Sequence, residues 1–194
     1  MHPLDAAVAL KAAGPDRFTG ATSPAYSNMV GPFGGITSSL LLNAVLQHPH
    51  SAGVPIALTV NFAAPIEDGA IGLTARAARI NRSTQHWTVE AAQEGLVVAL
   101  ASAVLAERRA TWSASQAQAP QGLPAPHELR RLNTAGFPVW IQRYDMRFIE
   151  GGLAGGLDGQ EQADSTSCLW VRDDPPRPMD FLSLAALCDS FFPR

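Results

Sequence analysis

The chain has 194 residues, a mass of 20.6 kDa, a formal net charge of -3 and a pI near 5.9. This length suffices for one large domain or two small ones, with roughly 70% of the surface buried on folding. The composition, 46% hydrophobic and 16% charged, excludes disorder as the main state. The arginines are scattered, so the sequence does not indicate nucleic-acid binding through phosphate neutralisation.

The cysteine count and the longest apolar stretch indicate the compartment. Cys168 and Cys188 are too few and too far apart for a disulfide framework or a metal knuckle. Residues 96–106 are the longest apolar stretch, far below the ~20 residues that span a bilayer, and the N-terminus lacks a basic region before an apolar core. We therefore expect a cytoplasmic protein with reduced cysteines and no membrane partner.

The first half of the chain predicts one helix among strands. The helix, residues 34–47, contains no charge, and a helix so poor in polar surface is expected to be wrapped by other elements. Alternating and apolar runs predict strands at residues 17–22, 55–65, 71–80, 85–93 and 96–105. The last of these is nearly continuously apolar, which is typical of a strand buried on both faces.

The second half predicts a shorter version of the same order. Residues 110–138, rich in Ser, Gln, Ala and Pro, predict a linker with a short helical piece near 127–132. Strands are expected at 139–149 and 166–172, and Asp180 is expected to cap a helix over 181–190. The expected domains are 1–109, a linker at 110–138, and an incomplete second domain at 139–194.

Four segments carry a resemblance to a known family: GPFGG at 31–35, LTVNFAAPI at 58–66, AAQEG at 91–95, and residues 167–194. With them the sequence resembles the acyl-CoA thioesterase-like superfamily of double-hotdog proteins. The resemblance implies an α+β fold in which an antiparallel sheet wraps a central apolar helix. It also implies one complete hotdog and a second one truncated after its helix.

The resemblance implies hydrolysis of a coenzyme A thioester by water that a carboxylate activates on the second helix, and Asp189 matches that carboxylate. In related enzymes a Thr or Ser and a Gln from later strands assist, and these would lie beyond Arg194. The spacing singles out Asp189 independently, because it shares a helix face with Leu182 and Ala185 in the last turn, where the helix dipole disfavours negative charge. The alternative is a solvated residue that turns the chain.

Two further groups are candidate site residues. Gly34, Gly35 and Ile36 begin the first helix, where unshielded amides can bind an oxyanion; alternatively, the glycines simply permit a tight entry. Gln93 is a weak candidate, because it stands in the AAQEG turn where the second repeat of related enzymes presents a catalytic Gln. The alternative for Gln93 is an ordinary solvated residue.

No motif indicates a metal or nucleotide cofactor, since GxSxG, the P-loop and HExxH are all missing from the sequence. The competing function is a non-catalytic truncated hotdog protein that binds acyl groups or only self-associates. Hydratase chemistry usually needs an Asp and His pair, and no His lies near Asp189 in sequence. The apolar helix 181–190 needs covering, so we expect a homo-oligomer or marginal stability.

Overall fold

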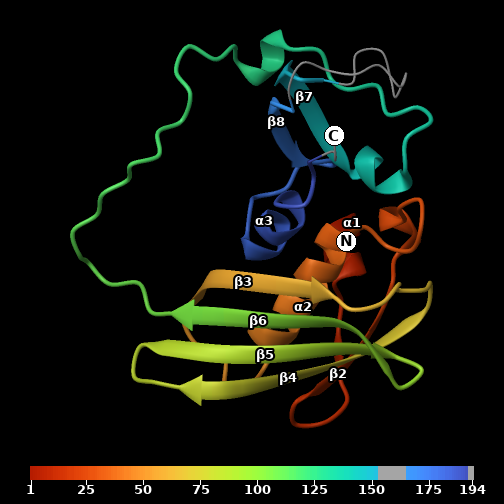
Figure 1. Cartoon of the computed structure of the whole chain (residues 1–194), viewed down its shortest axis with the longest axis vertical. Helices are drawn as coiled ribbons and strands as arrows, with labels where there is room; N and C mark the ends of the chain where they lie inside the picture. The colour runs from red at the N-terminus through yellow and green to blue at the C-terminus, as the bar shows by residue number, and fades with distance from the viewer. Residues whose placement is uncertain (153–164, 192–194) are drawn as a thin grey trace.

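The largest element of the structure is a six-stranded antiparallel sheet (Figure 1). The computed structural model describes residues 1–152 and 165–191. The strand order is β1-β2-β4-β5-β6-β3, which leaves β1 and β3 at the edges. The strands are β1 (Lys11–Ala12), β2 (Arg17–Ala21), β3 (Val54–Phe62), β4 (Ala70–Ile80), β5 (Thr84–Gln93) and β6 (Leu96–Ala106). All five strands predicted for the first half are therefore confirmed.

The second block contributes a two-stranded sheet and a helix. Strands β7 (Tyr144–Glu150) and β8 (Cys168–Asp173) pair antiparallel, and α3 (Phe181–Leu187) follows them. The short elements are α1 (Pro3–Ala7) and the 3-10 helices η1 (Pro24–Tyr26), η2 (Pro126–Glu128) and η3 (Val139–Arg143). The predicted helical piece near 127–132 is thus a single 3-10 turn, η2. The domain boundaries stay a prediction.

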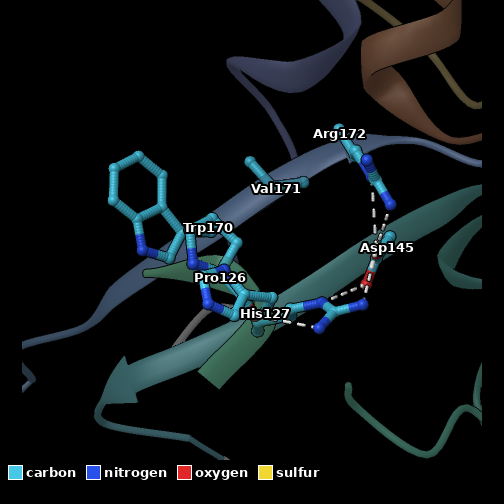
Figure 2. Close-up of a pocket in the computed structure, with 7 residues that line it drawn as sticks. Pro126, His127, Asp145, Trp170, Val171 and Arg172 are labelled. Atoms are coloured by element: carbon cyan, nitrogen blue, oxygen red, sulfur yellow. Dashed lines mark hydrogen bonds and ion pairs between the residues drawn. The ribbon is translucent and has the colours of Figure 1, made fainter. Parts of the chain in front are cut away.

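A buried carboxylate fastens the linker to the small sheet (Figure 2). Asp145 on β7 binds Arg147 through two hydrogen bonds of 2.9 and 3.1 Å, and it also accepts from Arg172 on β8. Arg147 in turn donates to the carbonyls of Pro126 and Leu129 in the linker. Because Arg147 uses its donors on both partners, the end of the linker is held against this sheet while residues 107–122 stay exposed.

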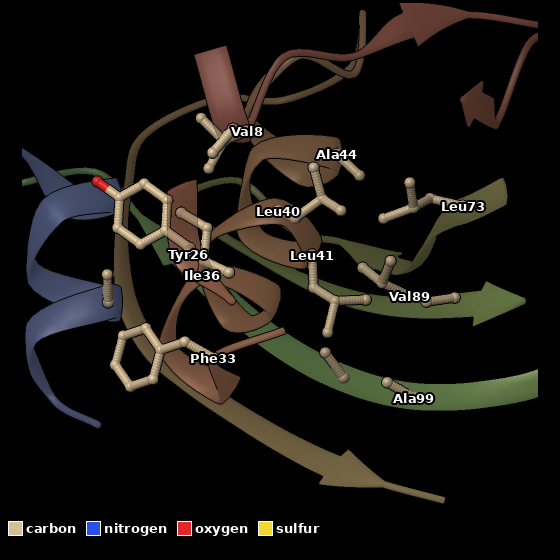
Figure 3. Packing of buried hydrophobic residues seen from close by; sticks show 14 of the residues in the cluster. Val8, Tyr26, Phe33, Ile36, Leu40, Leu41, Ala44, Leu73, Val89 and Ala99 are labelled. Atoms are coloured by element: carbon tan, nitrogen blue, oxygen red, sulfur yellow. The ribbon is translucent and has the colours of Figure 1, made fainter. Parts of the chain in front are cut away.

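Helix α2 (Gly34–Leu46) lies in the concave side of the large sheet, as its uncharged sequence predicts (Figure 3). Leu40 and Leu41 are almost fully buried, and Leu41 points towards Val89 and Ala99 of the strands. Asn43 is a buried hydrogen-bonding residue, since its amide donates to the Val8 carbonyl at 2.7 Å. The apolar helix wrapped by an antiparallel sheet is therefore confirmed.

Three local predictions were wrong. The strand expected at 139–149 begins only at Tyr144, because Val139–Arg143 forms η3, in which Trp140 stacks on Phe33 at a centroid distance of 4.1 Å. Strand β6 is buried on one face only, with Leu96 and Leu100 exposed on the other. Helix α3 ends at Leu187 instead of residue 190, and Asp189 lies in the turn beyond it.

No helix in residues 1–152 or 165–191 is long and apolar enough to cross a membrane.

Candidate active site

An apolar groove of about 750 Å³ lies between β3, α2 and α3. Alternate residues of β3, namely Ile56, Leu58, Val60 and Phe62, form one wall. Its other lining residues are Ser38, Leu42, Pro55, Ala57, Arg108, Phe181, Leu184, Ala185, Cys188 and Asp189. The groove combines a long apolar surface with one carboxylate, which suits a ligand with an apolar chain and one reactive polar group.

Helix α3 packs on α2, and this contact positions Asp189. Asp180 caps α3 as predicted, since its Oδ1 accepts from the Ser183 amide at 2.8 Å. The Ser39 hydroxyl of α2 donates to the Leu182 carbonyl of α3 at 2.6 Å. After α3 ends, the Asp189 amide donates to the Ala186 carbonyl and Ser190 is fully buried. The turn that carries Asp189 is therefore held in place on both sides.

The Asp189 carboxylate lies over the first turn of α2, where Gly34 and Gly35 lack side chains. A Cβ at Gly34 would lie 2.6 Å from Asp189 Oδ2, and a Cβ at Gly35 would lie 2.5 Å from the Ala186 carbonyl oxygen. The Gly35 amide donates a hydrogen bond to the carboxylate. The two glycines thus let the end of α3 approach the start of α2.

Two opposing effects act on the pKa of Asp189. Burial raises this pKa, and the hydrogen bond from the Gly35 amide lowers it, with a net rise above the ordinary aspartate value. The side chain still reaches solvent at the mouth of the groove. A half-sheltered carboxylate of raised pKa that contacts water is a stronger base than a fully solvated one.

The predicted site residues at the start of α2 and after the end of α3 lie together, whereas Gln93 lies elsewhere. Asp189, Gly34 and Gly35 are in contact, and Ile36 follows in the same turn of α2. The Gln93 side chain accepts from the Glu67 amide and donates to the Glu67 and Ala70 carbonyls. Gln93 is also not a lining residue of the groove in the described part of the chain.

Sequence reasoning missed the groove itself. It predicted the strand that became β3 and the apolar helix that became α3, but it did not predict that they face each other. Arg108, which lines the groove, was not distinguished from the other scattered arginines. The usable signal was the alternation of apolar residues along β3 together with a second apolar helix later in the chain.

The described residues contain no cluster of three or more His, Cys, Asp or Glu side chains that could hold a metal ion. The groove offers one carboxylate, the backbone amides of the first turn of α2 and an apolar surface. This combination can activate a water molecule beside a carbonyl whose substituents are apolar.

Comparison with known proteins identifies the family. Residues 23–106 match a model of the acyl-CoA thioesterase N-terminal domain, and residues 107–194 match the C-terminal domain of the same proteins. Among curated proteins, no sequence matched.

Solved structures agree with this result. The chain is 44% identical to a hotdog-fold protein of unknown function from Alicyclobacillus acidocaldarius, with a TM-score of 0.92; the match covers 100% of this chain and 70% of that one. An acyl-CoA thioesterase II, TesB2, from Mycobacterium marinum shows the same fold at 18% identity and a TM-score of 0.72, covering 96% and 68% of the two chains. The sheet that encloses α2, the matched domains and these structures together place the chain in the acyl-CoA thioesterase family, with a hotdog fold.

Proposed function

We propose that the chain hydrolyses a coenzyme A thioester to a free acid and coenzyme A, with Asp189 as the general base. The observation that carries the proposal is the position of the Asp189 carboxylate, at one end of an apolar groove and over the amides of α2. The family match supplies the substrate class. The contact between Asp189 and the first turn of α2 supports the choice of these residues.

The reaction follows from this arrangement in two steps. In the first, Asp189 takes a proton from water as the water oxygen bonds to the thioester carbon, and the carbonyl oxygen becomes an oxyanion. In the second, the oxyanion reforms the carbonyl, the carbon–sulfur bond breaks, and the proton passes from Asp189 to the leaving thiolate. The products are a carboxylic acid and the free thiol.

Different amides of the α2 turn have different tasks in this mechanism. The Gly35 amide, expected from the sequence to bind the oxyanion, donates to Asp189 and orients it. The neighbouring amides of Gly34 and Ile36 are left to stabilise the oxyanion, helped by the positive end of the helix dipole. In this mechanism, the amide that orients the base and the amides that bind the oxyanion come from one helix turn.

A thiol-release assay over a series of acyl-CoA chain lengths tests the proposal. Asp189→Asn is expected to lower kcat by ~100-fold or more, because it removes the base while keeping the shape of the side chain. Asp68→Asn, in an exposed turn, is the matched control and is expected to leave kcat unchanged. Equal activity of Asp189→Asn and the unmodified chain would remove Asp189 from the mechanism.

The same assay addresses the non-catalytic alternative. Acyl-CoA binding without any thiol release by the unmodified chain would favour a protein that only binds acyl groups. The cytoplasmic location and the homo-oligomeric state remain predictions of the sequence.

A further inference from the structure

The charges that line the groove lie at its two ends. Among its described lining residues, Asp189 is the one acid and Arg108 the one base. Asp189 is at the Phe62 end, since a Cβ at Gly34 would touch both Asp189 Oδ2 and the Phe62 ring, at 2.6 and 3.2 Å. Arg108 is at the opposite end, because it follows Ala106, which pairs with Val54 at the start of β3.

The distance between the two ends follows from the strand. Seven residue steps separate Pro55 from Phe62, and at about 3.3 Å per residue they span about 23 Å. Helix α3 runs alongside in the opposite direction to α2, since Leu182 contacts Ser39 while Ala186 lies beside Gly35. Between its two ends, the described lining residues of the groove are uncharged.

Arg108 has no partner within the described ranges. Five other arginines pair with carboxylates: Arg76, Arg131, Arg147, Arg172 and Arg177. Arg108 forms neither a salt bridge nor a hydrogen bond with any residue of 1–152 or 165–191. A guanidinium at the end of an apolar channel offers several donors to an anion and does not lose its charge.

We infer that the substrate lies lengthwise in the groove, with its thioester carbonyl at Asp189 and an anionic group at its far end bound by Arg108. This inference rests on the proposed function and adds a specificity residue to it. Two parts of an acyl-CoA can supply such a group. One is the diphosphate of coenzyme A, at the end of the pantetheine arm; the other is the terminal carboxylate of a dicarboxylic acyl chain.

The test compares Arg108→Gln with Arg109→Gln, a neighbouring arginine that does not line the groove. Four substrates are used: a straight-chain acyl-CoA, its terminal-carboxylate counterpart, and the N-acetylcysteamine thioesters of the same two acyl groups, which lack phosphate. Arg108→Gln is expected to raise KM about 10-fold for substrates whose anion occupies the groove, with kcat nearly unchanged. Arg109→Gln is expected to change neither value.

The substrate pattern identifies the source of the anion. A raised KM for both coenzyme A thioesters and neither N-acetylcysteamine thioester identifies the diphosphate. A raised KM for both terminal-carboxylate substrates alone identifies the dicarboxylic chain. The inference is overturned if Arg108→Gln acts no more strongly than Arg109→Gln, or acts equally on the uncharged N-acetylcysteamine thioester.

A binding measurement separates this inference from the proposed function. Calorimetry with non-hydrolysable thioether analogues of the same four substrates needs no turnover. The chain could release no thiol from any thioester and still bind the analogues about 10-fold more weakly after Arg108→Gln. That outcome would contradict the hydrolase proposal and support the anion site. Turnover that Asp189→Asn abolishes and Arg108→Gln leaves unchanged would contradict only the anion site.

Discussion

Two residues without side chains determine where the Asp189 carboxylate lies. At Gly35 an added methyl group would meet a backbone oxygen and the Phe33 ring at 2.5 Å, so the ends of α2 and α3 could no longer meet. At Gly34 the added group would meet the Asp189 carboxylate itself. Gly35 thus permits the contact between the helices, and Gly34 permits the observed position of the Asp189 carboxylate.

Alanine substitutions are expected to separate these two roles. Gly35→Ala should lower the free energy of unfolding by about 1–3 kcal/mol, because the contact atoms belong to backbone and a packed ring. Gly34→Ala should leave stability nearly unchanged but lower kcat by ~10–100-fold, because a flexible side chain moves aside. Urea unfolding and the thiol-release assay give the two values.

Gly72→Ala in β4 is the control for both substitutions. Its nearest neighbour would be the Ala92 carbonyl oxygen at 3.8 Å, so neither stability nor kcat is expected to change by much. Full activity of Gly34→Ala would mean that the observed position of the carboxylate is not needed.

The raised pKa of Asp189 predicts how stability and activity depend on pH. Since the folded pKa lies above the unfolded value, Asp189 favours folding below about pH 3.9, and this contribution is lost as pH rises through the folded pKa. Asp189→Asn should therefore have a higher Tm than the unmodified chain at pH 7, and this advantage should shrink on acidification. In the unmodified chain, kcat/KM should fall on the acid side with a midpoint above 3.9.

Thermal melts from pH 7 to 4 and a pH–rate profile measure these effects. A lower Tm for Asp189→Asn at pH 7 would show that the hydrogen bond from Gly35 outweighs the cost of burying the charge.

At the scale of elements, sequence periodicity predicted the helices and strands that depend on local residue patterns. It did not predict those that depend on contacts with a distant part of the chain. The strands of the large sheet and helix α2 were predicted because alternation and uncharged helical spacing are properties of one segment. Residues 139–143 failed because a short apolar run fits a strand or a helical turn equally well. Here the stacking of Trp140 on Phe33, 107 positions earlier in the chain, accompanies the 3-10 turn.

The candidate site shows the same division. Asp189 and the Gly34–Gly35 pair were each identified from local chemistry, as a carboxylate beside an apolar stripe and as glycines at a helix start. Their contact joins positions more than 150 residues apart, and nothing in either segment encodes it.

The cap of α3 yields a prediction at this scale. Asp180→Ala should lower the free energy of unfolding by about 1 kcal/mol, because the Ser183 amide loses its acceptor. Asp180→Asn keeps a capping oxygen and loses only the charge that faces Arg177, so it should cost less. Urea unfolding of both variants tests this, and an equal loss would point to the ion pair with Arg177 instead of the cap.

At the scale of the whole molecule, apolar surface remains exposed beside the free edge of the sheet. Ile56 and Phe62 on β3 are 54% and 53% exposed, and Leu184 on α3 is 45% exposed. An edge strand without charges is a template for association. Helix α3, which the sequence predicts to need covering, is covered on one side by α2, so part of this need is met within the chain.

The side chains of Ile56, Phe62 and Leu184 also line the groove, so we expect self-association that depends on protein concentration and that competes with substrate for the groove. Sedimentation velocity over a range of concentrations measures this, and Ile56→Lys should shift the distribution towards monomer. Leu100→Lys, on the outer face of the sheet, is the control and should shift it less. A single monomeric species at high concentration would contradict the prediction.

The meeting of Asp189 with the first turn of α2 has one more consequence. In the proposed mechanism, the base comes from the block that follows the linker and the amides that orient it come from the block that precedes it. We therefore expect neither half to hydrolyse a thioester by itself. A small displacement of α3 from α2 would therefore lower the rate of thioester hydrolysis, even if the hydrogen bonds of both sheets stayed intact. The rate is for this reason a sensitive measure of the contact between the two helices.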